Sequence, residues 1–207
     1  MTAVTLDAAA RSNGMDRESE QALVRRVRAG ETAAFDAIHA EFNSRLYGFL
    51  ARLTGSRDTA QDLLEDTWLR FVAYAARLDP DTRLGPWLFT VARNLHVTYR
   101  RARALESRAS ASLELWPAPV QDSPFEETAG NELQRRLEAA LASLPIDARE
   151  VLLLVGVEGL RPAEAAVVCG VSPEALRQRL KRARALLAQR LTDSELVPAL
   201  QISEAHS

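Results

Sequence analysis

The stretch PAEAAVVCGVSPEALRQRLKRARALL, residues 162–187, decides the fold of the C-terminal part of the chain. Its first proline can open a short helix, and Gly170 suits a reversal of the backbone. Ser172 is a preferred N-cap and Pro173 favours the first helical position, so a longer helix should begin there. A short helix, a tight turn and a longer helix in this order predict a helix-turn-helix.

The longer helix of this motif is strongly cationic. Between residues 172 and 190, six positive residues stand against one negative residue, in a chain whose net charge is −2. Its apolar residues recur at helical spacing and leave long polar side chains on the opposite face, where arginine and glutamine can read bases in the major groove. We therefore expect DNA binding, and a helical hairpin with a solvated face is the alternative. The candidate DNA-binding residues are Ser172, Glu174, Arg177, Gln178, Lys181 and Arg182.

The rest of the chain also has the periodicity of helices. Apolar residues recur at steps of three and four, and no segment alternates as a strand would. Alanine, leucine and arginine, which favour helices, dominate the composition. The predicted helices span residues 19–29, 35–54, 58–78, 87–108, 133–144, 147–158, 162–168 and 173–191. The predicted fold class is therefore all-α.

An acidic segment that contains proline divides the chain. Residues 109–130 hold three prolines and have no helical period, and from residue 114 to residue 132 there are five acids and no base. This composition is typical of a flexible linker. The linker separates two small helical domains, 17–108 and 131–191, which are flanked by a disordered extension at 1–16 and an acidic tail at 192–207.

Composition disfavours several classes of protein. The chain has one cysteine, Cys169, and three scattered histidines, so we expect no disulfide and no metal site. No nucleophile is paired with a base and no glycine-rich loop suits a phosphate, so we expect neither an enzyme nor a cofactor. No apolar run approaches the ~20 residues of a membrane span, and the N-terminus lacks the features of a secretory signal. A soluble cytoplasmic protein is expected.

A second basic block lies in the N-terminal half. Residues 83–108 hold six arginines and one glutamate. The loop that leads into this helix contains Asp81, Thr82 and Arg83. Such a loop and helix can hold unpaired bases while the cations follow the phosphates, although solvated charge is again the alternative. Trp87 begins the helix, and its spacing favours a place in the core over a role in base stacking.

Three carboxylates precede this second basic block. Asp62, Glu65 and Asp66 stand at positions i, i+3 and i+4, so they share one helix face. An acidic face is usually only solvated. Because Leu63 and Leu69 flank these acids, a surface for a partner protein is a second interpretation.

Five stretches together resemble the extracytoplasmic function (ECF) group of the sigma-70 family, the specificity factors of bacterial RNA polymerase. They follow one another in the family's order and cover about residues 18–104 and 131–190. The stretches are AAFDAIHAEFNSRLYGFLARLTG, AQDLLEDTWLRF, GPWLFTVARNL, REVLLLVGVEGL and AEAAVVCGVSPEALRQRLKRAR.

The resemblance implies roles for these surfaces. Asp62, Leu64, Glu65 and Asp66 would face the clamp helices of the polymerase's largest subunit. The loop at 79–85 would meet the upstream melted promoter element, together with a helix that carries Arg93, Asn94, Arg100 and Arg101. The last helix would read the element farther upstream, through Arg177, Gln178 and Lys181 above all. An anti-sigma factor is a possible partner in this family.

The chain departs from the family pattern at three places. Glu65 and Asp66 stand where glutamine and glutamate are usual. Arg161 replaces the serine or threonine that usually caps the short helix, a loss of about 0.5–2 kcal/mol if nothing compensates. Ala175 and Leu176 replace a threonine–valine pair in the last helix.

The expected function is that of a promoter-specificity subunit without catalytic activity. It would bind core RNA polymerase, recognise two promoter elements and assist promoter melting. The alternative is a helix-turn-helix transcriptional regulator that dimerises through its N-terminal domain, which has no need of the acidic face at 62–66. A third class, an adaptor that binds only proteins, would have no salt-sensitive affinity for DNA.

Overall fold

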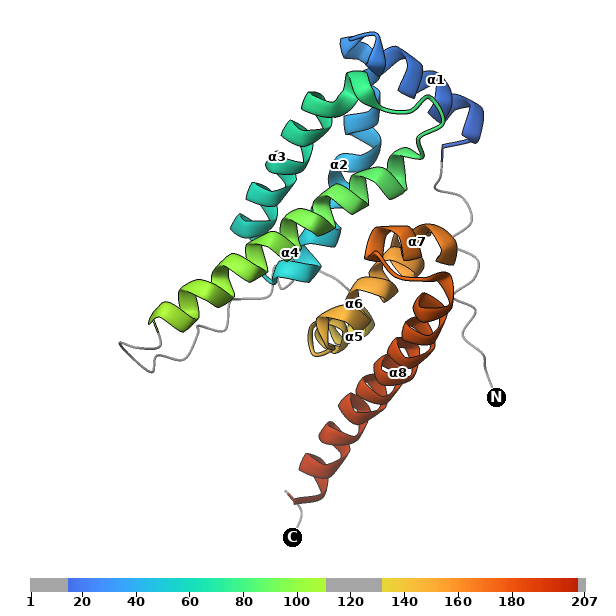
Figure 1. The fold of residues 1–207 in the computed structure, drawn as a ribbon. Helices are drawn as coiled ribbons and strands as arrows, with labels where there is room; N and C mark the ends of the chain where they lie inside the picture. The colour runs from blue at the N-terminus through green and yellow to red at the C-terminus, as the bar shows by residue number, and fades with distance from the viewer. Residues whose placement is uncertain (1–14, 111–131, 205–207) are drawn as a thin grey trace.

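The computed structural model describes residues 15–110 and 132–204, with side chains at 15–107 and 132–193. Within these ranges the chain forms helices and no strand, which confirms the all-α fold class (Figure 1). The predicted extension at 1–16 and linker at 109–130 lie almost wholly outside the described residues.

Four long helices and one short turn build the first domain. They are α1 (Arg17–Arg28), α2 (Thr32–Thr54), α3 (Arg57–Tyr74), the 3-10 turn η1 (Ala75–Arg77) and α4 (Leu84–Ser110). Asp16 caps α1 through its carboxylate, and Gly55 ends α2 in a left-handed conformation with φ 68°, which glycine adopts without strain. α4 begins at Leu84, before the predicted start, because Pro86 is tolerated in a first helical turn. The loop before α4 is therefore only 79–83.

Aromatic side chains fill the core of the first domain. Phe49 and Phe89 meet edge to face with ring centroids 5.3 Å apart. Phe71 is fully buried and contacts Trp68 and Trp87 in the same manner. Trp87 is partly buried against this core, as its spacing predicted.

Five helical elements form the second domain. They are α5 (Glu132–Ala142), α6 (Ile146–Leu152), the π-helical segment η2 (Leu153–Val157), α7 (Pro162–Cys169) and α8 (Pro173–Glu204). The sequence places Leu133, Leu137, Leu141 and Leu144 at helical spacing and so predicts one buried stripe. This prediction is partly wrong, because Leu133 and Leu137 are 63% and 37% exposed and only Leu141 and Leu144 are buried. α8 continues to Glu204, beyond its predicted end.

The helix-turn-helix forms as predicted between α7 and α8. Gly170 ends α7 with φ 64°, and the Ser172 hydroxyl accepts the N–H of Ala175 at 3.1 Å. At the start of α7, a carboxylate oxygen of Glu164 accepts the backbone N–H of Arg161 at 3.0 Å. This bond supplies half of a capping box, so it partly compensates for the missing serine or threonine.

The two domains pack against each other over one continuous hydrophobic core. α7 lies against α4, and α6 contacts α2 (Figure 1). A Cβ atom added at Gly85 would lie 3.8 Å from Leu160 of the second domain, so the first turn of α4 closely approaches that domain. The sequence predicted two tethered domains and gave no sign of this closed arrangement.

Over the described residues, no helix is both long enough and apolar enough to cross a membrane.

Candidate polymerase and promoter surfaces

One face of α3 is acidic at one end and apolar at the other. Asp62, Glu65 and Asp66 are exposed, and among the described side chains none of them forms an ion pair. The same stripe continues with Leu69, which is 67% exposed, and Val72, which is 59% exposed. We call these five residues the α3 ridge. Large exposed apolar side chains beside unpaired carboxylates are typical of a binding surface.

Leu64 does not belong to the α3 ridge. Its side chain is only 4% exposed and lies in the hydrophobic core. The assignment of Leu64 to the polymerase-facing surface was therefore wrong about its orientation. The periodicity explains the error, because Leu64 stands between exposed carboxylates in sequence but points to the opposite side of the helix.

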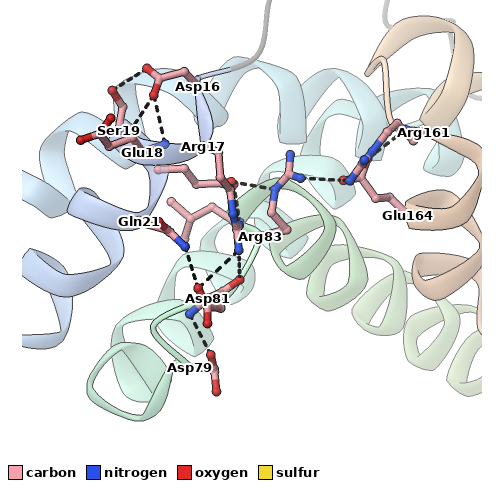
Figure 2. Close-up of polar contacts among 12 residues, drawn as sticks. Asp16, Arg17, Glu18, Ser19, Gln21, Asp79, Asp81, Arg83, Arg161 and Glu164 are labelled. Atoms are coloured by element: carbon pink, nitrogen blue, oxygen red, sulfur yellow. Dashed lines mark hydrogen bonds and ion pairs between the residues drawn. The ribbon is translucent and has the colours of Figure 1, made fainter.

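The loop at 79–83 is held in a defined conformation by α1 (Figure 2). The Asp81 carboxylate accepts a hydrogen bond from Gln21 Nε2 at 2.6 Å, and the Asp81 carbonyl accepts one from Arg17 Nη2 at 2.7 Å. Within the loop, an Asp79 carboxylate oxygen accepts the N–H of Asp81 at 2.7 Å. Thr82 and Arg83 are half-buried, and Asp81 is exposed but tethered to α1.

Glu20 is a functional candidate that sequence reasoning missed. It is 5% exposed and accepts the N–H of Leu84, at the start of α4, at 2.7 Å. Its second oxygen lies 2.7 Å from Arg83 Nε, an ion pair without the alignment of a hydrogen bond. In the sequence Glu20 looks like an ordinary first-turn acid of α1. The one available signal was its position on the face that buries Val24 and Val27.

The basic residues of α4 differ in their availability. Asn94, Arg100 and Arg101 are exposed. Arg93 is 21% exposed and its Nε donates to Glu150 of α6 at 2.7 Å. The predicted promoter surface is thus partly covered by the second domain.

His96 lies on the buried side of the same helix. It is 2% exposed, and burial lowers its pKa from 6.5 to about 4, with further lowering by the charges of Arg100, Arg93 and Arg149. The histidine is therefore neutral at physiological pH.

The exposed face of α8 carries the predicted recognition residues. Arg177 donates to Glu174 at 2.7 Å, and this hydrogen bond holds the pKa of the Glu174 carboxyl below its usual range. Gln178, Lys181 and Arg182 are exposed, whereas Leu176 and Leu180 on the opposite face are buried. Ser172 caps the helix, so its oxygen has a structural role.

Between described side chains, four ion pairs cross the boundary between the domains, and each has its arginine in the first domain and its glutamate in the second. Glu150 and Glu158 are nearly buried, and burial raises the pKa of the Glu158 carboxyl despite the opposing charge of Arg45. The pairs are Arg45–Glu158 at 3.1 Å, Arg52–Glu138 at 2.7 Å, Arg83–Glu164 at 3.2 Å and Arg93–Glu150 at 2.7 Å.

Two protein-family profiles match the chain, one in each domain. The profile described as "Sigma-70 region 2" covers residues 38–106, and the one described as "Sigma-70, region 4" covers residues 134–187. The α3 ridge, the loop and the basic part of α4 lie in the first match, and the helix-turn-helix lies in the second.

Two relatives match most of the chain. The RNA polymerase sigma factor CarQ of Myxococcus xanthus is 36% identical over 83% of this chain and 97% of CarQ. The ECF RNA polymerase sigma factor EcfG of Rhodopseudomonas palustris is also 36% identical, over 69% of this chain and 77% of EcfG.

A solved structure has a similar arrangement. The sigma factor RpoE from Bartonella quintana, in complex with the anti-sigma factor NepR, superposes with a TM-score of 0.64 and 27% identity, over 76% of this chain and 96% of RpoE. These matches, together with the two basic surfaces and the helix-turn-helix, show that the chain belongs to the ECF group of the sigma-70 family of RNA polymerase sigma factors.

Proposed function

We propose that this sigma factor docks on core RNA polymerase through the α3 ridge and binds promoter DNA through two basic surfaces, one on each domain. The observation that carries the proposal is the combination of two separate cationic helices with an acidic ridge that forms no ion pair with any described side chain. The protein acts in the cytoplasm, where polymerase and promoter are found, and it catalyses no reaction itself.

The α3 ridge combines two kinds of contact. Asp62, Glu65 and Asp66 supply a negative potential that steers association with a basic partner. Leu69 and Val72 supply apolar area that becomes buried on binding. A regulator that dimerises has no need for the acidic half of this ridge, so the ridge favours a subunit of polymerase over that alternative.

The first promoter surface consists of the loop at 79–83 and the exposed polar residues of α4. Arg100 and Arg101 lie on consecutive positions and are free of ion pairs among the described side chains, so they can follow the phosphate backbone. The loop and Asn94 are candidates for contacts with unpaired bases, whose capture assists strand opening.

The second promoter surface is the exposed face of α8. Arg177 and Gln178 have the donor geometry for base edges in the major groove. Lys181, which the resemblance placed among the residues that read the element, stands with Arg182 one turn farther along the helix, and both suit phosphate contacts. The Arg177–Glu174 pair would rearrange on binding. The N–H groups that Arg177 donates to Glu174 cannot at the same time donate to a guanine edge.

Promoter binding through Arg93 requires the domains to separate. Glu150 occupies the Arg93 guanidinium in the closed arrangement, and Glu164 lies beside that of Arg83. The 21 residues between the end of α4 at Ser110 and the start of α5 at Glu132 can span at most ~70–75 Å, which permits the two basic surfaces to reach sites about two turns of duplex apart. Core polymerase and DNA would therefore hold an opened form.

The docking proposal is tested by co-elution with core polymerase. Asp62→Lys combined with Glu65→Lys should abolish co-elution, whereas the wild-type chain should elute with the enzyme. A wild-type chain that elutes apart from core polymerase would overturn the proposal. The reversed variant should retain the wild-type affinity for DNA, which separates loss of docking from loss of folding.

A further inference from the structure

The first turns of α1 form a polar clamp on the loop that precedes α4. Arg17, Glu20 and Gln21 all reach the segment 81–84, which lies sixty or more positions away in sequence. Figure 2 shows Arg17 and Gln21 directed at Asp81. Asp16 fixes the start of this clamp, because its carboxylate accepts the N–H groups of Glu18 and Ser19, each at 3.0 Å.

Glu20 is the buried centre of the clamp. An ionised carboxylate that is removed from water requires compensating partners. Glu20 has two in the segment it holds: the N–H of Leu84 at 2.7 Å and the Arg83 guanidinium at 2.7 Å. Leu84 is the first residue of α4, so its N–H group has no acceptor inside the helix. Glu20 therefore acts as an N-terminal cap supplied by a different helix, at the end where a negative charge is favourable.

The clamp also decides which loop atoms remain available. Gln21 and Arg17 turn the Asp81 carboxylate and carbonyl towards α1. The N–H of Thr82 donates to the Asp79 carbonyl at 2.9 Å, which closes the turn inside the loop. Asp79 and Asp81 carry acceptor carboxylates, so Thr82 and Arg83 are the side chains of the loop that can donate to a base or a phosphate, and Arg83 is aimed by Glu20.

We propose that Glu20 is a positioning residue for promoter recognition. By holding the Leu84 N–H and the Arg83 guanidinium, it presets the loop at 79–83 in the conformation that meets the unpaired bases of the melted element. This inference rests on the proposed function of the loop as a promoter contact. In the closed arrangement Glu164 lies near the same guanidinium, at 3.2 Å, but only Glu20 belongs to the same domain as Arg83 and can hold it after the domains separate.

The test uses holoenzyme that is assembled from core polymerase and the full chain. Its DNA probes carry a single-stranded melted element, either in the preferred sequence or with one base replaced. Glu20→Gln keeps an acceptor for the Leu84 N–H but removes the charge that holds Arg83. Because charge-assisted contacts are worth more than neutral ones, we expect the ratio of the two affinities to fall about tenfold. Glu18→Gln is the matched control: Glu18 is exposed in the same turn of α1, and the ratio should not change.

A merely structural role for Glu20 makes a different prediction. In that case Glu20→Gln would lower thermal stability and weaken the binding of both probes equally, with no change in the ratio of the two affinities. A double-mutant cycle separates the two cases. If Glu20 acts through Arg83, the Glu20→Gln change should have no further effect on the ratio in an Arg83→Gln background.

The outcomes distinguish this inference from the proposed function. If holoenzyme with the Glu20→Gln variant discriminates between the probes as well as wild-type holoenzyme does, the inference is overturned and the proposed function stands. If wild-type holoenzyme prefers neither probe over unrelated single strands, the loop is not a promoter contact, and both are overturned.

Discussion

Arg93 of α4 and Glu150 of α6 form an ion pair across the domain boundary, with Arg93 Nε 2.7 Å from Glu150 Oε1. A residue expected to meet DNA is thereby held by a carboxylate of the same chain. The thiol of Cys169 lies in this cluster, where burial and the negative charge of Glu150 raise its pKa to about 12. The cysteine is therefore an inert part of the interface, as expected for a buried thiol without a redox role.

We expect Glu150→Gln to favour the open form. Removing one member of a buried pair typically costs 3–5 kcal/mol, but the Arg93 side chain is 21% exposed here, so we expect about 2 kcal/mol against the closed form. The free protein should then have a larger radius of gyration by X-ray scattering and a higher affinity for promoter DNA. Glu132→Gln, at an exposed pair with Arg135 on α5, should change neither quantity. An unchanged radius and affinity in the Glu150 variant would show that this pair does not hold the domains together.

The apolar half of the α3 ridge should contribute to polymerase binding independently of its charge. Leu69→Ala together with Val72→Ala removes exposed area, so it should leave folding stability nearly unchanged. We expect the affinity for core polymerase to fall about tenfold, because buried apolar area at an interface core is worth ~25 cal/mol per Å². Titration calorimetry at high salt, where the carboxylates are screened, isolates this contribution. If the double variant binds core polymerase with wild-type affinity, only the carboxylates of the α3 ridge contribute to docking.

Arg177 and Lys181 on α8 should differ in what they contribute to promoter binding. Arg177→Ala should cost about 1–3 kcal/mol on the preferred element and relax the preference at one base pair. Lys181→Ala should weaken binding to all sequences alike and reduce the salt slope of the affinity by about one. Binding isotherms over a series of salt concentrations and single-base variants check both. If both variants lose affinity equally on every sequence, Arg177 also contacts phosphates and reads no base.

The neutral state of His96 should make stability depend on pH. Its folded pKa of about 4 is below the ordinary 6.5, so the unfolded chain binds the proton more readily between these values. Stability should therefore decrease as pH falls from about 6.5 to about 4, by about 3 kcal/mol in total, with no further loss from this group below pH 4. Arg93 and Arg100 on α4 and Arg149 on α6 face the ring and add to this cost.

Denaturant unfolding of the wild type and of His96→Gln, at several pH values, isolates the histidine. Other titrating groups, such as Glu158, are common to both proteins and cancel in the difference. The unfolding free energy of the wild type minus that of His96→Gln should grow as pH rises from 4 to 6.5. A constant difference over this range would show that His96 titrates alike in the folded and unfolded chains.

Local features of the fold were predictable from sequence. Gly55 and Gly170 end helices, and Ser172 caps α8. These features depend on a few neighbouring residues and on rules of backbone conformation, so tertiary packing did not need to be known. The helix-turn-helix followed from them, and the all-α class followed from the apolar period of the sequence.

Features that depend on contacts distant in sequence were not predictable. Arg45 and Glu158 stand 113 positions apart, and each looks like an ordinary surface charge in the sequence. The clamp of Glu20 on Leu84 was hidden for the same reason. On α5, Leu133 and Leu137 continue an apolar period but remain exposed, because periodicity shows which residues share a face without showing what covers it.

Run-off transcription with purified core polymerase, with and without this chain, on fragments of genomic DNA tests the central claim most directly. The account predicts defined start sites that appear only when the chain is present and that disappear in the Asp62→Lys, Glu65→Lys variant. Transcripts that are identical with and without the chain would contradict it.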